Sequence, residues 1–434
     1  MRSKLTDAAL LLILAAGAAR ADTTLTIATI ANGDMTIMQQ LSGTFEQAHP
    51  GIHLRWQVMD DAELRKQVLA AMNSGQPTFD VITVGTYEAP LWGKRGWLTP
   101  LDALPADYQV DDLLKPVRKA LSWQDKLYAL PFYGESSMTY YRKDLFAARG
   151  LTMPEEINWS DIKRLAAKLT DKANGVYGLC LRGRPGWGDN VAFVTTMANG
   201  YGAQWFDLDW KPTLDSPEWR EVLSDYVQMV HDYGPPDSAE NSFGQILKLF
   251  AEGKCAMWVD STVAAGLLIN PQISRVADKI DFAPAPGELT RNGSNWLWSW
   301  ALAVPASAAN KAAAQEFISW ATSPAYIQQV AQTVGWGAVP PGSRYSTYQQ
   351  ASYQRLAPYA KRVQAAMESA TVEQPTLGPV PYQGVQYVSI PGFDQMGNAV
   401  GENIAALLQG KLTLDETLQR NQQAVTEIYA KTNP

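Results

Sequence analysis

The stretch LTIATIANGDMTIMQQLSGTFEQAHPGIHLRWQVM at residues 25–59, followed by FDVITV at residues 79–84, decides the fold of this chain. Residues 25–30, 52–59 and 79–84 read as strands. Residues 35–48 carry an amphipathic helical pattern that His49-Pro50-Gly51 closes, and Asp60 or Asp61 can cap a helix over residues 63–73. The order strand, helix, strand, helix, strand predicts a parallel sheet covered by helices on both faces.

Two polar loops follow the first and third of these strands. Asn32-Gly33-Asp34 comes after the first strand, and Gly85-Thr86-Tyr87-Glu88 comes after the third. In such sheets ligands bind beyond the carboxyl ends of the strands, so both loops are expected to face one crevice. Each loop can also be read as an ordinary helix cap, and the sequence leaves both readings open.

The rest of the chain continues the α/β pattern. Residues 126–131 read as a hairpin and strand that lead into residues 132–141. Because 434 residues exceed what one core usually holds, and no flexible linker interrupts them, we expect two domains joined by crossing strands. The further predicted helices cover residues 159–169, 190–199, 218–233 and 311–322, and the further predicted strands cover residues 178–182, 255–259 and 297–304.

The N-terminal residues have the pattern of a secretory signal peptide. Arg2 and Lys4 precede a short apolar run, and Ala19-Arg20-Ala21 forms a small-residue cleavage site. The apolar run is too short to span a bilayer. We expect cleavage after Ala21 and export of a soluble protein. The first cysteine is Cys180, so no lipid anchor of the bacterial lipoprotein kind is expected.

Charge and motifs exclude several functions. The formal net charge is −7 without any basic block, which argues against nucleic acid and anionic membranes as partners. The three histidines do not group with the cysteines at metal-ligand spacing. No hydrolase elbow, phosphate loop or dinucleotide fingerprint appears. The 15 Trp and 18 Tyr serve either large cores or a binding site.

Cys180 and Cys255 are the two cysteines of the chain. In an exported protein an even pair suggests a disulfide. Two separately buried thiols are the alternative, because sequence alone cannot show that their Cα atoms approach each other.

Several loose motifs, in a fixed order, together resemble the extracellular solute-binding proteins of ABC importers, the family that includes maltose-binding protein. They are Phe79-Asp-Val81, Tyr128-Ala-Leu-Pro131, Tyr141-Arg-Lys-Asp-Leu145, Phe250-Ala-Glu-Gly-Lys-Cys-Ala-Met257, residues 310–324 and Gly410-Lys-Leu-Thr-Leu-Asp-Glu-Thr-Leu418. Within that family the chain is most similar to the sorbitol/mannitol-binding subset. That similarity rests on Asn32-Gly-Asp-Met35, Gly85-Thr-Tyr-Glu88, Pro90-Leu-Trp-Gly-Lys94 and Leu181-Arg-Gly-Arg-Pro-Gly-Trp-Gly188.

The resemblance implies an α/β, two-lobed periplasmic-binding-protein fold, with a mainly parallel sheet flanked by helices in each lobe. Three crossings would join the lobes near residues 131–136, 298–304 and 335–341. The N-terminal lobe would comprise residues 22–132 with 302–337, and the C-terminal lobe residues 133–301 with 338–434. The protein would be a monomer of the periplasm that works with the membrane permease of an ABC importer, without cofactor or metal.

A polyol presents a row of hydroxyls and a thin edge of C–H groups, so its site requires charged and amide groups together with aromatic faces. From the first lobe the candidates are Asn32, Asp34, Thr86, Tyr87 and Glu88. Glu135 is carried over from the matching segment of the maltose binder, which has a ligand-contacting Glu there. From the second lobe the candidates are Arg182, Trp187 and Asp260, although Arg182 could instead pair with Asp189 at the surface.

Trp296, Trp298 and Trp300 alternate and therefore share one strand face, which serves either core packing or ligand stacking. Trp298 and Trp336 are chosen as candidates because they lie at expected crossings. Two rival functions remain open. One is a binder of a mono- or oligosaccharide or amino-sugar. The other is an exported carbohydrate enzyme that uses Glu88 with Glu135 or Asp260 as an acid and base pair.

Overall fold

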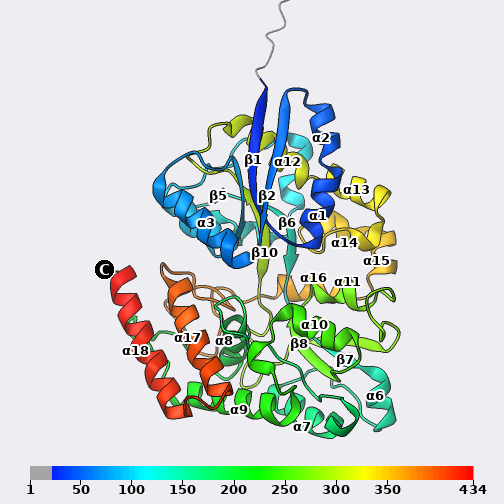
Figure 1. The fold of residues 1–434 in the computed structure, drawn as a ribbon, viewed down its shortest axis with the longest axis vertical. Helices are drawn as coiled ribbons and strands as arrows, with labels where there is room; N and C mark the ends of the chain where they lie inside the picture. The colour runs from blue at the N-terminus through cyan, green and yellow to red at the C-terminus, as the bar shows by residue number, and fades with distance from the viewer. Residues whose placement is uncertain (1–21, 434) are drawn as a thin grey trace, which may run out of the picture.

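The computed structural model describes residues 22–433 of the 434-residue chain. The predicted signal peptide, residues 1–21, lies outside the described residues. Within them, none of the helices combines the length and apolar character needed to cross a bilayer. The described chain forms two halves stacked along the long axis of the molecule (Figure 1), each built around a sheet of its own.

The first sheet has the strand order β2-β1-β3-β10-β6. Strand β1 (Thr23–Ile30) pairs in parallel with β2 (Ile52–Met59) and β3 (Val81–Gly85), which confirms the parallel arrangement predicted for these strands. Strand β10 (Trp298–Ala303) inserts antiparallel between β3 and β6 (Leu130–Glu135). Residues far apart in the chain therefore meet at one edge of this sheet.

The helices of the N-terminal segment begin and end at recognisable signals. Helix α3 (Asp61–Ser74) begins where the Asp60 side chain accepts the N–H of Glu63 at 2.9 Å, and it ends at Gly75, whose φ is 66°. The helix predicted over residues 35–48 is instead two helices, α1 (Gly33–Leu41) and α2 (Gly43–Ala48). The break falls at Ser42, whose hydroxyl donates to the carbonyl of Gln39 at 2.7 Å and competes with the helical pattern.

The second sheet has the order β8-β7-β9, with β8 (Met257–Ser261), β7 (Ser137–Arg142) and β9 (Ile280–Pro284). Strand β7 is antiparallel to both neighbours, so the expectation of a mainly parallel sheet in each lobe is wrong for this one. The strand predicted over residues 178–182 is also absent from the named strands. Its backbone makes a single isolated parallel bridge, from Cys180 to Trp258. Without a continuous parallel neighbour, the antiparallel pairs of β7 set the character of the sheet.

We call the first sheet with the helices packed on it the first lobe, and the second sheet with its helices the second lobe. Helices α3 and α12 (Lys311–Ala321) pack on β1 in the first lobe. In the second lobe α17 (Phe393–Leu408) packs against α8 (Asn190–Gly200), α9 (Pro217–Tyr233) and α18 (Leu414–Thr432). The other helices are α4 (Glu88–Lys94), α5 (Lys115–Ala120), α6 (Lys143–Ala148), α7 (Trp159–Leu169), α10 (Phe243–Ala251), α11 (Ala264–Leu268), α13 (Pro324–Thr333), α14 (Tyr345–Gln349), α15 (Ala351–Leu356) and α16 (Ala360–Glu368). The short elements are β4 (Ser122–Trp123), β5 (Lys126–Leu127) and the 3-10 turns η1 (Ala106–Tyr108), η2 (Val110–Asp112), η3 (Lys172–Asn174), η4 (Ser238–Glu240) and η5 (Trp336–Ala338).

The chain passes from one sheet to the other at identifiable points. Strand β6 ends at Glu135 in the first sheet and β7 begins at Ser137 in the second, so only Ser136 separates them. Beyond η5, the backbone carbonyl of Ser343 still accepts the N–H of Leu114, a residue of the predicted N-terminal lobe, at 3.0 Å. The predicted lobe boundaries at residues 132/133, 301/302 and 337/338 stay predictions, and these contacts favour slightly later first and third boundaries.

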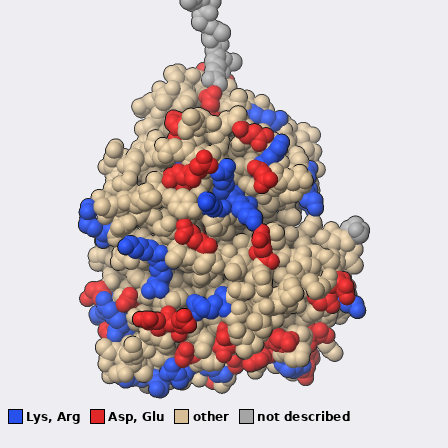
Figure 2. Space-filling view, turned by 180° about the vertical axis from the view of Figure 1, so that it is seen from behind, with Lys and Arg blue, Asp and Glu red and all other residues tan. Residues whose placement is uncertain are grey.

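A disulfide joins Cys180 to Cys255, the pair that the sequence suggested, with Cα atoms 5.9 Å apart. It ties the segment before α8 to the chain entering β8 in the second lobe. Acidic and basic residues are interspersed over the face of the molecule seen from behind (Figure 2).

Candidate functional site

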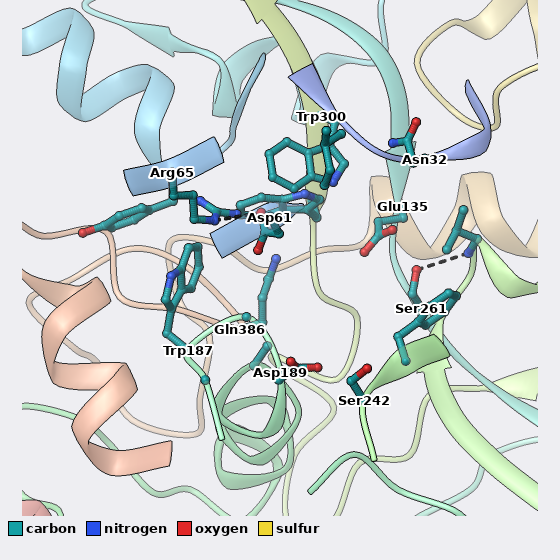
Figure 3. Close-up of a pocket in the computed structure, with 18 of the residues that line it drawn as sticks. Asn32, Asp61, Arg65, Glu135, Trp187, Asp189, Ser242, Ser261, Trp300 and Gln386 are labelled. Atoms are coloured by element: carbon teal, nitrogen blue, oxygen red, sulfur yellow. Dashed lines mark hydrogen bonds and ion pairs between the residues drawn. The ribbon is translucent and has the colours of Figure 1, made fainter. Parts of the chain in front are cut away.

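A cavity of about 1850 Å³ lies between the two lobes and receives side chains from both. The loops after β1 and β3 line it from the first lobe, as predicted from the strand order. In the close-up, the labelled side chains surround an open space, with Arg65 and Trp187 on one side and Glu135 and Ser261 on the other (Figure 3).

Asn32 and Asp34 lie at the carboxyl end of β1 and both line the cavity. The Oδ1 atom of Asn32 accepts the N–H of Met35 at 2.8 Å and caps α1, so the cap reading holds for this residue together with its place in the cavity wall. Burial raises the pKa of Asp34 to about 7. Near neutral pH its carboxyl can therefore act as a donor or an acceptor.

Arg65 of α3, which was not among the sequence candidates, stands at the centre of a cluster that spans the cleft. Its Nε donates to Oδ1 of Asp61 at 3.0 Å, and its Nη1 pairs with Oε1 of Glu88. The guanidinium lies 4.5 Å from the ring centroid of Trp187 and 5.1 Å from that of Trp300. A cation over aromatic faces is attracted by the ring quadrupoles. The Asp61/Arg65 spacing of one helical turn was the sequence signal that could have found this residue.

Glu88 lines the cavity, but both of its carboxylate oxygens are already engaged. Oε1 pairs with Arg65, and Oε2 accepts the N–H of Gly85 at 2.9 Å. This carboxylate holds Arg65 in place and closes the turn after β3. Its effect on a ligand would therefore be chiefly indirect, through the position of Arg65.

Glu135 sits at the end of β6, where the first lobe passes into the second. It is directly opposite Trp298 in the β6–β10 ladder, so the two side chains share one face of the sheet. The hydroxyl of Tyr133 donates to its Oε2 at 3.3 Å. Burial raises the pKa of Glu135 to about 7, although a hydrogen bond from Ser261 and the charge of Arg182 oppose the rise.

Arg182 and Asp260 form a buried bidentate ion pair in the second lobe. Nε donates to Oδ2 at 2.8 Å and Nη2 to Oδ1 at 2.5 Å. Burial alone would lower the pKa of Arg182, but Asp260 raises it above its ordinary value, so the guanidinium stays charged. The predicted alternative partner, Asp189, lies 3.9 Å from Nη1 and forms its shorter ion pair, 2.7 Å, with Arg184.

Asp260 itself does not line the cavity and has no exposed surface. Besides Arg182, it accepts Nε1–H of Trp258 at 3.0 Å and the N–H of Ser261 at 2.6 Å. Its role in this structure is to orient Arg182, which does line the cavity. The carboxylate has no free edge to offer a ligand.

The alternating tryptophans Trp296, Trp298 and Trp300 all line the cavity, together with Trp187. Of the stripe, only Trp298 was chosen from the sequence. The ring of Trp298 packs edge-on against Trp300 at 5.2 Å and against Trp187 at 5.9 Å between centroids. These rings form aromatic walls on which the apolar edge of a small molecule can rest.

The structure brings most of the predicted site residues together and leaves some aside. Thr86 is buried and does not line the cavity. Trp336 does not line it either, although Gly337 and Ala338 of the same 3-10 turn, η5, do. Tyr87 lines it, but its hydroxyl is bonded elsewhere. Polar lining residues that the sequence reasoning missed include Asp61, Arg65, Asp189, Ser242, Ser261, Gln386 and Asn398. Most of them lie outside the strand-end loops on which the prediction relied.

Carboxyls, guanidinium groups, hydroxyls and amides thus alternate with indole faces around one cavity between the lobes. Such a wall can hydrogen-bond a small molecule rich in polar groups while covering its apolar edges. Within residues 22–433, no group of His, Cys, Asp and Glu is arranged to hold a metal ion.

Comparison with known proteins gives a consistent result. A family model described as bacterial extracellular solute-binding protein matches residues 31–328. The chain is 48% identical over 401 residues, 92% of each protein, to the mannitol-binding protein of Pseudomonas aeruginosa. It resembles the crystal structure of an ABC transporter solute-binding protein from Agrobacterium vitis with bound D-mannitol, with a TM-score of 0.91 and 49% identity, covering 94% of this chain and 99% of that one.

A solute-binding protein of Agrobacterium radiobacter in complex with ribitol shares the fold, with a TM-score of 0.81 and 24% identity over 94% of this chain and 99% of that one. The resemblance in sequence spans nearly the whole described chain, and the two-lobed fold agrees with it. The chain therefore belongs to the family of bacterial extracellular solute-binding proteins.

Proposed function

We propose that this protein is the substrate-binding component of an ABC importer and captures an acyclic hexitol, such as mannitol or sorbitol, between its lobes for delivery to the membrane permease. The observation that carries the proposal is the near-50% identity, over more than nine-tenths of the chain, to one relative named for mannitol and to a structure that holds it. At that identity the walls of the cleft are expected to keep their chemistry.

The lining of the cavity supports a polyol as the ligand. Asn32, Asp34, Glu135 and Arg182 supply hydrogen-bonding groups from both lobes, and Asp61 and Arg65 add to them. Charged partners strengthen hydrogen bonds to hydroxyls, and an isomer that leaves a buried group unmatched loses about 1–3 kcal/mol. Trp187 and Trp298, with Trp296 and Trp300, would cover the C–H edge of the carbon chain. Selectivity among polyols would arise from the polar set, and general affinity from the rings.

Delivery without chemistry is the mode of action that we propose. The rival enzyme reading needs two carboxyls free to act as acid and base. Glu88 is bound to Arg65 and Gly85, and Asp260 is bound to Arg182, Trp258 and Ser261. Among the described residues, Glu135 has neither an ion pair nor a backbone donor of this kind, and burial raises its pKa to about 7, but a single such carboxyl does not make an acid and base pair. This supports binding over catalysis.

A saccharide remains the second candidate, because the cavity of about 1850 Å³ lies above the usual range of about 300–1,000 Å³ for small-molecule pockets. We also propose that the protein is cleaved after Ala21 and released into the periplasm as a monomer without a lipid anchor. The chain would cross between its two lobes near residues 131–136, 298–304 and 335–341.

Titration calorimetry of the mature protein tests the ligand. We expect one saturable site for mannitol or sorbitol and weaker binding of maltose and of amino-sugars. Glu135→Ala should weaken hexitol binding by roughly ten- to a hundredfold, because it removes a buried polar partner worth about 1.5–3 kcal/mol. Glu402→Ala, on the exposed side of α17, is the matched control and should bind like the parent. Absence of heat with every hexitol, or hydrolysis of a glycoside, would contradict the proposal.

A further inference from the structure

Tyr87 belongs to the first lobe by sequence, because it lies in the short turn after β3 and is the N-cap residue of α4. Its ring, however, lies among aromatic rings of the second lobe. Its centroid is 5.2 Å from that of Trp187, 5.7 Å from Tyr387 and 6.2 Å from Phe393. Only 6% of the residue is exposed. Tyr87 thus inserts from one lobe into a pocket of the other.

The hydroxyl of Tyr87 lies just before the first turn of α17. It donates to the carbonyl of Ile390 at 3.0 Å. Burial raises the pKa of this hydroxyl, and the nearby backbone N–H groups of Phe393 and Asp394 oppose that rise. The first amides of a helix lack partners within the helix, and the N-cap residue of α17 is Gly392, which has no side chain to supply one. The Tyr87 hydroxyl brings a polar group from the opposite lobe to this helix end.

The partners of Tyr87 are firmly part of the second lobe. Helix α17 packs against α8, α9 and α18, which lie together in the lower half of the molecule (Figure 1). The Ile390 carbonyl is a backbone group and cannot follow Tyr87 if the lobes separate. The contact consequently exists only when the lobes are closed.

We propose that Tyr87 is a latch between the lobes, a positioning residue that stabilises the closed form by binding Ile390 and the start of α17 rather than by reading the hydroxyls of the ligand. The inference rests on the proposed function. A group that binds only in the closed form shifts the population toward closure and strengthens every ligand by the same factor. Residues that contact the ligand directly would change the ranking of ligands instead.

Tyr87→Phe removes the hydroxyl and keeps the ring. We expect this variant to bind mannitol and sorbitol more weakly by one common factor, roughly two- to tenfold, which is the effect of one neutral hydrogen bond. The change should appear as faster dissociation in stopped-flow tryptophan fluorescence, with association little altered, because the latch forms after the ligand has entered.

Tyr382→Phe is the matched control. Tyr382 is equally buried, and its hydroxyl accepts the N–H of Trp205 at 3.1 Å within the second lobe. That variant should lose thermal stability without losing affinity. If the Tyr87→Phe protein binds both polyols as tightly as the parent, the latch is overturned. It is also overturned if the affinities for the two polyols fall by clearly different factors. A parent that binds neither polyol overturns the proposed function itself, which is a distinct result.

Discussion

Carboxylates that look equivalent in the sequence have different roles in the folded protein. The carboxylates of Asp260 and Glu88 are fully hydrogen-bonded to guanidinium and backbone partners, so they hold Arg182 and Arg65 in place. Asp34 and Glu135 lie in the cavity wall, and burial raises the pKa of each to about 7. The number and kind of partners, rather than residue type, separates a positioning group from a binding one.

Asp260→Asn should be strongly destabilising, because it leaves the buried Arg182 without its counter-charge. Breaking a buried ion pair by neutralising one partner costs about 3–5 kcal/mol. Urea denaturation measures the loss. The exposed pair of Arg220 with Asp415 supplies the control, since Asp415→Asn should change the free energy of unfolding by less than about 1 kcal/mol. Equal stability of the two variants would show that Asp260 is not structural.

Glu135→Gln should alter how stability depends on pH in the unliganded protein. The pKa of Glu135 is about 7 in the fold against its usual 4.5, so the folded state holds the proton more tightly. This group therefore makes the parent less stable as pH rises from 4.5 to about 7, and has no further effect above that. Gln does not titrate. Relative to the parent, the variant should gain stability between pH 4.5 and 8, on the order of 3 kcal/mol. Parallel pH profiles in urea denaturation would contradict the prediction.

At the scale of elements, the site depends on β10, which enters the first sheet between β3 and β6. This insertion places Trp298 opposite Glu135 and presses its indole against the backbone of β3 at Gly85. A Cβ at Gly85 would lie 2.2 Å from the Trp298 ring, so only glycine allows the approach. A strand that is remote in sequence thus brings the aromatic wall to the loop after β3.

Gly85→Ala should displace the Trp298 ring and weaken ligand binding while costing about 1–3 kcal/mol of stability through overpacking. Gly43→Ala is the control, since a Cβ there meets nothing within 4 Å and lies in helix α2. That change should be neutral or slightly stabilising. Calorimetry with mannitol and thermal melts compare the two. Unchanged affinity in Gly85→Ala would mean that the position of Trp298 is unimportant.

At the scale of the whole molecule, side chains of both lobes meet across the cavity. Arg65 lies over Trp187, and Tyr87 reaches Ile390, so the described form is closed at this side of the cleft. The chain passes from the first sheet to the second between β6 and β7 and returns to the first at β10. Crossings of this kind are the places where a two-lobed protein can open and close around its ligand. Ligand bound to both walls should favour the closed arrangement.

Small-angle X-ray scattering should therefore give a smaller radius of gyration with saturating mannitol than without ligand. The physical reason is that groups from both lobes bind the ligand together only in the closed form. A polyol that fails to bind in calorimetry serves as the control and should leave the scattering unchanged. A liganded protein with the same radius of gyration as the unliganded one would contradict closure by ligand.

Much of the first lobe follows from local sequence. The strands of residues 25–84, helix α3 and the loops at the strand ends were predictable, because hydrophobic periodicity and caps act within a few residues. The break at Ser42, which divides the helix expected over residues 35–48, was not predicted. Asn32, Asp34 and Glu88 were found as lining residues for the same reason. The family resemblance added Glu135, Arg182 and the two-lobed architecture, which periodicity could not supply.

Only the tertiary structure decided how these residues are used. Arg65 lies on a helix face that no strand-end rule selects, and it matters because Trp187, some 120 positions later, comes to lie against it. Asp260 was indistinguishable from a ligand-binding carboxylate until its three partners were placed around it. Tyr87 marked the right loop, but its hydroxyl meets Ile390 about 300 residues away. Periodicity reports which face of an element is buried, whereas the partner across a cleft depends on how the chain crosses between sheets.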